Sequence, residues 1–589
     1  MVEMKAGLEI HQQLDTNKLF CSCPSILRKD KPNKEVEREL NPVAGESGKI
    51  DIAAAYEKEK SKKFIYQIYD TNCLVELDEE PPHPINQEAL DIAIQISLLL
   101  NCKIFPTSQV MRKTVIDGSN TSGFQRTLLI AYDGYLDTSQ GKVGIETIAL
   151  EEDAARKINS DSNHTIYRLD RLGIPLVEIT TKPDLHNSEQ VKEAALKIGE
   201  ILRACKVKRG IGTIRQDLNV SIPKGNRIEI KGFQEPKIMQ QTVEQEITRQ
   251  QNLLKLQNKI TLPEKLHNIS NIFKNTDCKI LKGKIYAFKL PNMSGLLGKE
   301  IQTGKRLGTD LAEQVSSRTN LKGILHSDEN LEKYHITQEE INQIKNRLEI
   351  NKNDAFIFFN AQDGKKIKNI INNRLKSLKK GIPAEVRKSN PDGSTSFLRP
   401  MPGAARMYPE TDLHLLEISR QRINHLKAKL PKLASEHKAY LQEFGLNNEL
   451  IKNLLKKHKV DELKSLLEVN NNPKLIAKML TNFQDNIKLS KQEKQNIFTL
   501  DILESILEAV NKNISENDVE RVMQQLAEGK TLQEAMKKQS INIEQEVKNI
   551  IKQKPNLSEK AYMGLLMSKF KGQISGKEVM QALKKELKP

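Results

Sequence analysis

The sequence predicts a multidomain α+β protein with an N-terminal antiparallel-sheet domain, an inserted α+β domain and an all-α C-terminal part. Three observations support this. The 589 residues exceed what one hydrophobic core supports. Short stretches of alternating apolar and polar residues, separated by Gly, Pro and Asp, dominate the first 250 or so residues. From about residue 415 onwards, helical periodicity replaces them.

The composition favours a large anionic partner. The net charge of +17 and the pI near 9.2 are typical of nucleic-acid-binding proteins, although a lysine-rich solvated surface gives the same balance. Tryptophan is absent and aromatics make up 4%, which argues against base stacking as the main binding mode. No apolar run approaches the roughly 20 residues of a membrane span, and no signal-peptide pattern is seen. Six scattered cysteines fit a reducing compartment, so we expect a cytoplasmic protein.

The stretch GLEIHQQLDTNKLF at residues 7–20 predicts a strand with one polar face. Glu9 and His11 alternate with Leu8 and Ile10, so both polar side chains leave the same side of the strand. A carboxylate beside an imidazole suits a metal ion, provided that later segments complete the site. The alternative is an ordinary half-buried strand at a sheet edge facing water.

Three later strands repeat this alternation. The polar side chains that share a face are Glu178 and Thr180 in residues 175–180, Asp217, Asn219 and Ser221 in residues 214–222, and Glu229 and Lys231 in residues 228–231. A solvated face would more often be rich in Lys and Thr. A shared acidic surface would bind divalent cations through oxygen ligands, and magnesium commonly accompanies nucleotide phosphates.

Three adjacent acids follow an apolar strand in IETIALEEDAARK, at residues 145–157. Glu151, Glu152 and Asp153 could form an ordinary helix N-terminus, where negative charge is favourable. They could equally complete the metal site.

The loop at residues 117–127 contains Gly118 and Gly123, spaced as in a phosphate-binding loop. The Lys and Ser/Thr of a Walker motif are missing, so that interpretation fails. Ser119, Asn120 and the nearby Arg126 could still offer donors to an anion, or the loop could be a mobile surface turn.

Cys21, Cys23 and Cys73 are candidate zinc ligands, because CxC and a distant cysteine provide three thiolates. Glu76 stands where the second cysteine of a CxxC would fall, and His83 is close in sequence. Free buried thiols are the alternative.

Helices are expected at residues 87–100, 188–204 with Ser188 as N-cap, and 242–259. An inserted unit spans about 271–400, with a capping box at Thr337 and a buried strand, DAFIFFN, at 354–360. RMYPETD at 406–412 should return the chain to the first domain. Helices follow, with caps at Thr531 and Ser575. Residues 515–589 form either a basic tail that binds nucleic acid or a plain solvated bundle.

Several of these stretches resemble one known family. GLEIHQQLDTNKLFCSC, IALEEDAARK, YRLDRLGIPLVEITTKPD, IRQDLNVSI, IEIKGFQ and RMYPETDL are similar to the B/E subunit family of tRNA-dependent amidotransferases. The insertion, with DAFIFFNAQDGKK, resembles the GAD domain of bacterial aspartyl-tRNA synthetases, which favours the archaeal E-type branch. The resemblance implies a catalytic cradle domain at 1–270 completed by about 401–415, a GAD domain at 271–400, a helical domain at 416–514 and a YqeY-like tail at 515–589.

The resemblance also implies an activity. A ligase of this family uses ATP to phosphorylate the γ-carboxylate of glutamate attached to tRNA(Gln), and then transfers ammonia to give glutaminyl-tRNA(Gln). Glutamine is the amido donor. An asparaginase-like D subunit would release the ammonia, since this chain has no amidase nucleophile motif. A heterodimer or a dimer of heterodimers is expected.

Site residues are carried over by position. Glu9, His11, Glu152 and Glu178 match the family's magnesium-binding residues and are the expected catalytic set. The expected ATP contacts are Ser119, Asn120, Arg126, Asp217 and Lys231, with Glu229 in a neighbouring motif. The chain departs from the B-type pattern after Cys73, where Cys-Leu-Val-Glu replaces CxxC, so zinc at Cys21, Cys23 and Cys73 stays open.

Two other functions compete with the ligase. A non-catalytic tRNA-binding scaffold would have the same basic charge and a merely solvated acidic face. A synthetase is suggested by the insertion alone, but the sequence around it lacks convincing class II catalytic motifs.

Overall fold

The computed structural model describes residues 3–587 apart from 43, 45–47, 49, 51, 59–61, 162, 234–235, 320, 322, 402–406, 511, 538–542, 556 and 570–575. The chain forms two compact units, Met1–Pro431 and Lys432–Pro589. The first is rich in strands and the second is largely helical, which confirms the predicted α+β class at this level. No helix in the described part combines the length and apolar composition needed to span a membrane.

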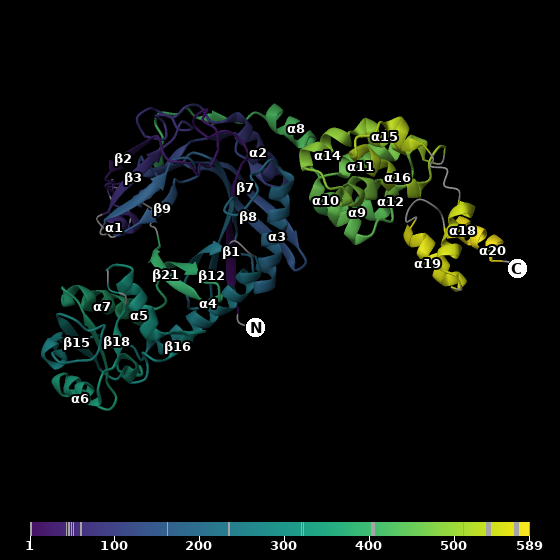
Figure 1. Cartoon of the computed structure of the whole chain (residues 1–589). Coiled ribbons are helices and arrows are strands. Elements are labelled where there is room, and N and C mark those ends of the chain that lie inside the picture. Colours follow the sequence, from purple (N-terminus) through teal and green to yellow (C-terminus); the bar gives the residue numbers. More distant parts are fainter. Residues whose placement is uncertain are drawn as a thin grey trace. The chain divides into compact units, whose positions relative to one another are not determined.

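An 11-stranded sheet organises the first unit (Figure 1). In spatial order its strands are β21 (Thr395–Pro400), β20 (Glu385–Ser389), β13 (Ile228–Phe233), β12 (Ile214–Ser221), β1 (Lys5–Gln13), β11 (Pro175–Thr181), β8 (Gly141–Glu152), β7 (Phe124–Thr138), β6 (Met111–Thr114) and β22 (Met407–Pro409), with β4 (Lys103–Ile104) also on β7. All neighbours run antiparallel except β13 and β20, which are parallel.

Strand β1 lies in the interior of this sheet, between β11 and β12. Leu8 and Ile10 are fully buried, whereas Glu9 and His11 on the opposite face are half-buried. The predicted alternation is therefore confirmed. The alternative of an edge strand facing water is wrong, because both edges of β1 are hydrogen-bonded to neighbouring strands.

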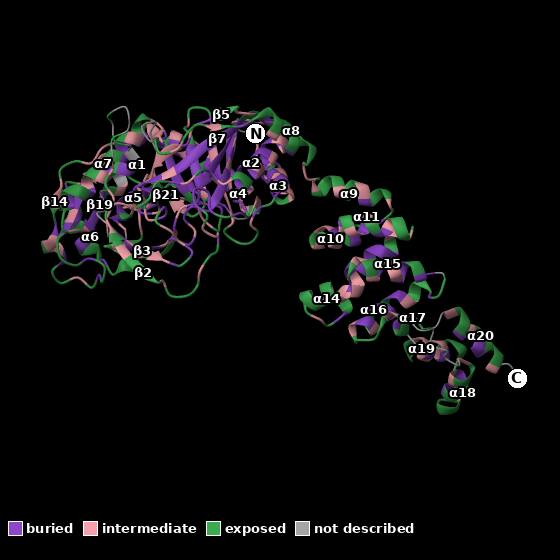
Figure 2. Ribbon diagram, turned by 90° about the horizontal axis from the view of Figure 1, so that it is seen from above, coloured by how far each residue is buried: buried purple, intermediate pink, exposed green. Residues whose placement is uncertain are grey.

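Helices cover the sheet from one side. The helices of this region are α1 (Ile52–Lys58), α2 (Gln87–Leu99), α3 (Ser188–Ala204), α4 (Pro236–Gln257) and α8 (Arg420–Ala428). Helix α2 packs on β7 and β8, α3 on β1 and β7, and α4 on β12 and β13. Figure 2 shows buried residues concentrated along the sheet and these helices.

Two details of these helices differ from the sequence predictions. The N-cap of α3 is Asn187, whose side chain accepts from the N–H of Gln190; Ser188 is already helical. Helix α4 begins at Pro236, before the predicted residue 242, and Met239 near its start is buried like the apolar residues further along the helix.

Two smaller sheets complete this region. One contains β2 (Lys34–Arg38), β3 (Lys63–Ile68), β10 (His164–Arg168) and β9 (Arg156–Ser160), and the other pairs β23 (Leu416–Glu417) with β5 (Thr107–Ser108). After the insertion, β22 pairs with β6 of the large sheet and β23 pairs with β5. Arg406 itself lies outside the described residues.

The inserted segment has its own sheet and core. Its elements are β14 (His267–Asn268), η1 (Ser270–Phe273), β15 (Ile285–Leu290), β16 (Glu300–Gln302), β17 (Lys305–Arg306), α5 (Leu307–Ser316), β18 (Leu325–His326), η2 (Leu331–Tyr334), α6 (Gln338–Arg347), β19 (Ala355–Asn360) and α7 (Gly364–Lys380). The capping box at Thr337 and the buried strand β19 are confirmed. Strands β20 and β21 also fall within residues 271–400, but they pair into the large sheet.

A buried ion-pair network joins the inserted segment to the large sheet. Arg249 of α4 donates two hydrogen bonds of 2.8 Å to Glu246 and lies 3.6 Å from Glu385 of β20. Arg374 of α7 donates to Glu385 at 2.6 Å and to Asp310 of α5 at 2.7 Å. Because these charges are removed from water, each must keep its partner.

The described residues of the second unit form helices and no strand. These are α9 (Ala434–Glu443), α10 (Asn448–Lys457), α11 (Val460–Val469), α12 (Pro473–Lys478), the π-helix η4 (Met479–Phe483), α13 (Gln484–Asn486), α14 (Lys491–Ile497), α15 (Leu500–Ala509), η5 (Glu516–Asp518), α16 (Val519–Ala527), α17 (Leu532–Met536), α18 (Ile543–Gln553), α19 (Glu559–Lys569) and α20 (Gly576–Glu586). Helices α18–α20 share a separate small core. The cap at Thr531 is confirmed, and that at Ser575 falls outside the described residues.

Replacing Arg249 with Met should destabilise the first unit by about 3–5 kcal/mol, because Glu246 would be left buried without its main partner. Urea unfolding followed by circular dichroism measures this. Lys255→Met, at an exposed position of the same helix, serves as control and should change stability by less than about 0.5 kcal/mol. Equal unfolding midpoints for the two variants would contradict the role of the network.

Candidate active site on the polar face of the large sheet

The register of β1 brings acids from neighbouring strands to His11. His11 lies opposite Glu178 of β11, and its Nε2 is 3.3 Å from the Glu178 carboxylate. Glu151 of β8 completes the group, and one ligand atom from each of the three residues lies within 4.8 Å of the others. An imidazole and two carboxylates at this spacing are a suitable donor set for a divalent cation.

A second acidic group lies on the same face. Glu9 stands opposite Asp217 of β12, and Glu229 of β13 joins them within 4.8 Å. Asn219 donates to Glu9 at 2.9 Å. Lys231 bridges Asp217 at 2.6 Å and Glu229 at 2.5 Å, so the predicted polar faces of four strands do meet.

Lys113 of β6 is a functional candidate that the sequence analysis missed. Its ammonium donates to Glu151 and, at 3.5 Å, to Glu178. The sequence gives no indication of this contact, because β6 and β11 are far apart along the chain and a single Lys in a short strand belongs to no recognisable motif.

The electrostatics of the face favour a bound cation. Burial raises the pKa of Glu9, and repulsion from Glu229 and Glu178 raises it further. Burial and Glu178 likewise raise the pKa of Glu151. Burial alone would lower the pKa of His11, but the hydrogen bond and charge of Glu178 raise it above its ordinary value. Burial opposes ionisation of Glu178 too, yet Lys113 and His11 hold its pKa well below the ordinary value.

Glu152 lies apart from the other three predicted magnesium ligands. It is opposite Pro175, and Glu151 is opposite Leu176, so the two adjacent acids leave opposite faces of the sheet. Glu152 accepts from Arg126 at 3.1 Å. The alternation along β8 already indicates this difference. Glu152 follows the buried Leu150 by two residues, so its side chain leaves the same side of the strand as Leu150. The helix N-terminus alternative is wrong, since β8 runs through Glu152 and no helix follows directly.

The predicted ATP-binding loop uses its donors within the protein. The N–H and hydroxyl of Ser119 both donate to Asp117, at 2.9 and 2.6 Å. Asn120 is buried. Arg126 donates to Glu410 at 2.8 Å as well as to Glu152. Among the predicted ATP contacts, only Asp217 and Lys231 lie on the acidic face.

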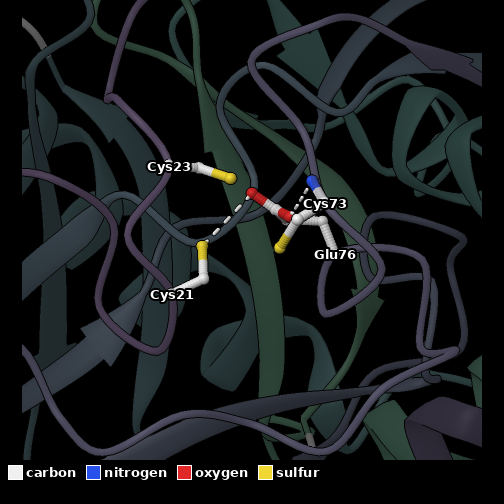
Figure 3. A group of neighbouring side chains, drawn as sticks. All are labelled: Cys21, Cys23, Cys73 and Glu76. Carbon is white, nitrogen blue, oxygen red and sulfur yellow. Dashed lines mark hydrogen bonds between the residues drawn. The ribbon is translucent and has the colours of Figure 1, made fainter.

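The structure brings the three candidate cysteines together with a carboxylate (Figure 3). Cys21, Cys23, Cys73 and Glu76 each place one ligand atom within 4.8 Å of the others. Glu76 accepts from the N–H of Cys73 at 2.8 Å and from the buried Lys18 ammonium at 2.5 Å. His83 instead contacts Glu80, at 2.9 Å. Glu76, and not His83, is therefore the fourth residue of this group, a position that the sequence left undecided.

The three thiols differ in acidity. A hydrogen bond with Cys21 lowers the pKa of Cys23 to about 7, despite partial burial. That same hydrogen bond, together with burial, raises the pKa of Cys21. Burial and Glu76 raise the pKa of Cys73 to about 12.

A β-rich unit whose main sheet gathers acids, a histidine and lysines on one face has the donor groups of a metal-dependent catalytic domain of the α+β class. A family profile described as the GatB/GatE catalytic domain matches residues 4–424. The chain therefore belongs to the GatB/GatE family.

Full-length relatives agree with this assignment. The chain is 44% identical to the E subunit of the glutamyl-tRNA(Gln) amidotransferase of Methanocaldococcus jannaschii, with 100% of this chain and 99% of the relative covered. It is 40% identical to the E subunit of the same enzyme from Sulfurisphaera tokodaii, with coverage of 100% and 99%. The E subunit from Methanosarcina acetivorans is also 40% identical, with coverage of 99% and 97%.

Cys23 should be alkylated by iodoacetamide at least roughly tenfold faster than Cys73 near neutral pH in metal-free protein, because only its thiol is appreciably ionised there. Mass spectrometry of the modified peptides gives the rates. Cys23→Ser should abolish the fast phase. Equal rates at Cys23 and Cys73 would contradict the hydrogen bonding described.

Proposed function

We propose that the protein is the E-type subunit of a glutamyl-tRNA(Gln) amidotransferase and converts glutamyl-tRNA(Gln) to glutaminyl-tRNA(Gln) with ATP. The observation that carries the proposal is the group His11–Glu151–Glu178 inside a domain matched to the GatB/GatE catalytic domain. Its full-length relatives bear the same enzyme name. The basic net charge of +17 suits a tRNA partner.

The proposed chemistry has two steps. A γ-carboxylate oxygen of the tRNA-bound glutamate attacks the γ-phosphorus of ATP, and ADP leaves. Ammonia then attacks the acyl carbon, and phosphate leaves as the amide forms. Carboxylate and triphosphate repel each other, so the first step needs positive charge at the site.

Magnesium fits the residues of the acidic face. His11, Glu151 and Glu178 would hold one ion, and Glu9, Asp217 and Glu229 offer a second position. Burial, together with repulsion from neighbouring carboxylates, raises the pKa of Glu9 and of Glu151, and a bound cation would oppose both effects. Bound magnesium would neutralise and align the phosphate oxygens. Lys113 and Lys231 would keep the carboxylates oriented.

In this proposal Glu152 supports the site from the other face of β8. Its carboxylate is tied through Arg126 to Glu410, so it would hold the end of β8 in place. The family resemblance assigns the metal to Glu152, whereas the geometry favours Glu151. Comparing ATP turnover in Glu151→Gln and Glu152→Gln distinguishes the two assignments.

The remaining proposals concern partners and organisation. An asparaginase-like D subunit would hydrolyse glutamine and supply ammonia, in a heterodimer or a dimer of heterodimers. A cytoplasmic reaction is part of the proposal, since the substrate would be a charged tRNA. We retain the GAD, helical and YqeY-like regions as proposed domains. The small core of α18–α20 supports a separate tail.

Zinc is a further proposed ligand, at Cys21, Cys23, Cys73 and Glu76. One ligand atom of each of these four residues lies within 4.8 Å of the others, and small side-chain adjustments would bring three thiolates and one carboxylate into a tetrahedral set. Lys18 would offset part of the excess negative charge. Bound zinc would protect all three thiols from alkylation.

Glu151→Gln and Glu178→Gln should each lower tRNA-dependent ATP turnover by roughly 10²-fold, because each removes a carboxylate proposed to hold the magnesium ion that would neutralise the transferred phosphate. The assay contains glutamyl-tRNA(Gln), ammonium and magnesium, so it needs no source of ammonia from a second protein. Glu146→Gln, at an exposed position of the same strand, is the matched control and should match the parent.

Three results of this assay would change the proposal. A loss in Glu152→Gln with full turnover in Glu151→Gln would return the metal to Glu152. Full turnover in all variants would refute the assigned site. No turnover in the parent would favour a non-catalytic scaffold.

Magnesium affinity should rise with pH, because Glu9, Glu151 and His11, whose pKa values are raised, must lose protons before they bind the ion. We expect net proton release on binding at about pH 6, and less at about pH 8. Calorimetry in buffers of different ionisation enthalpy measures the released protons. Affinity independent of pH over this range would contradict the site.

A further inference from the structure

A cleft in the first unit has no part in the proposed reaction. It has a volume of about 580 Å³. Residues of α5, α7 and β21 line it, and β21 is one of the two edge strands of the large sheet. None of its lining residues belongs to the acidic face or to the cysteine group.

One part of the lining is a regular row of polar side chains on α7. Lys365, Asn369, Asn373 and Ser377 recur every four residues, so they follow one another along the same helix face. The first three offer donors to a ligand, whereas the Ser377 hydroxyl donates to the main-chain oxygen of Asn373 at 2.9 Å. Lys365, Asn369 and Asn373 are exposed, as is the neighbouring Lys366. The row extends for roughly 18 Å at the rise of an α-helix.

The lining also includes an arginine over an aromatic ring. Arg318 stacks over Phe397 of β21, with its guanidinium carbon 5.2 Å from the ring centre. It also donates to the main-chain and side-chain oxygens of Gln314, at 2.9 and 2.8 Å. Because arginine only donates, this contact sets the orientation of the Gln314 amide. The amide nitrogen of Gln314, which lines the cleft, finds no acceptor within the described residues.

The cleft has an excess of positive charge. Arg374 and Glu385 line it, but they neutralise each other in the buried network. Asp363 caps α7 by accepting from the N–H of Lys366. Neither Lys365 nor Lys366 pairs with a carboxylate in the described part of the chain. Outside the buried network, the two lysines Lys365 and Lys366 therefore outnumber the one lining carboxylate, Asp363, and this excess of positive charge suits an anion.

We propose that this cleft binds the phosphodiester backbone of RNA. The row on α7 is roughly 18 Å long, so a single phosphate would reach only one part of it. An RNA strand would offer successive phosphates and riboses to the lysines and amides along the row. The arginine on Phe397 provides a surface against which a base stacks. The identity of the RNA as glutamyl-tRNA rests on the proposed function; the backbone contact itself does not.

The test compares two double variants of the full-length protein. Lys365→Ala/Lys366→Ala removes two cleft cations, and Lys379→Ala/Lys380→Ala removes the same charge from exposed positions of α7 outside the cleft. Binding of tRNA is measured at several salt concentrations. The cleft variant should bind roughly tenfold more weakly at about 0.1 M salt, with a log–log salt slope lower by about two. The control should change far less.

Other outcomes overturn the proposal. Equal losses in both variants would indicate a diffuse positive field, and unchanged binding in the cleft variant would exclude the contact. Inorganic triphosphate is the second probe. If the cleft variant loses triphosphate binding but keeps tRNA binding, the site is for small phosphates. Binding is measured without turnover, so failure of the ligase assay leaves this result intact.

Discussion

The antiparallel register of β1 with its two neighbours is the constraint on which the site depends. Glu9 and His11 are useful only because β11 and β12 present Glu178 and Asp217 directly opposite them. A slip of one residue would turn every polar side chain of β1 towards the apolar side. Burial of Leu8 and Ile10 beneath the helices makes such a slip costly, so the same contacts that stabilise the fold also align the acids.

The acidic face stores electrostatic repulsion in the folded state. Burial and neighbouring acids raise the pKa of Glu9 and Glu151, and two lysines offset part of the charge. A region selected for stability alone would not place these acids together. The arrangement makes sense if a cation and a phosphate complete it, since both then gain from charges that the fold already holds in position.

The insertion is tied to this sheet on both sides. Arg249, which precedes it, and Glu385 of β20, which lies within residues 271–400, belong to one buried network that also includes α5 and α7. Beyond it, Glu410 accepts from Arg126, which in turn donates to Glu152 at the end of β8. The inserted segment therefore leaves the large sheet continuous. Its α5 and α7, together with β21, form the cleft for which we propose RNA.

Local patterns in the sequence determined the strands, their polar faces and the family. Alternation predicted which side chains of β1, β11, β12 and β13 share a side, because this depends only on consecutive residues. The motifs, matched in order, predicted the family that the comparisons confirm. The three cysteines were recognisable from their type and spacing.

Only the tertiary structure decided which of these residues meet. It brought Glu151 rather than Glu152 to His11, added Lys113 to the site, and placed Glu76 among the cysteines. It also showed that Arg126 is held between two carboxylates, one of them supplied from beyond the insertion. The physical reason is that pairing between distant strands sets cross-strand neighbours, and a single strand's periodicity contains no information on its partner's register.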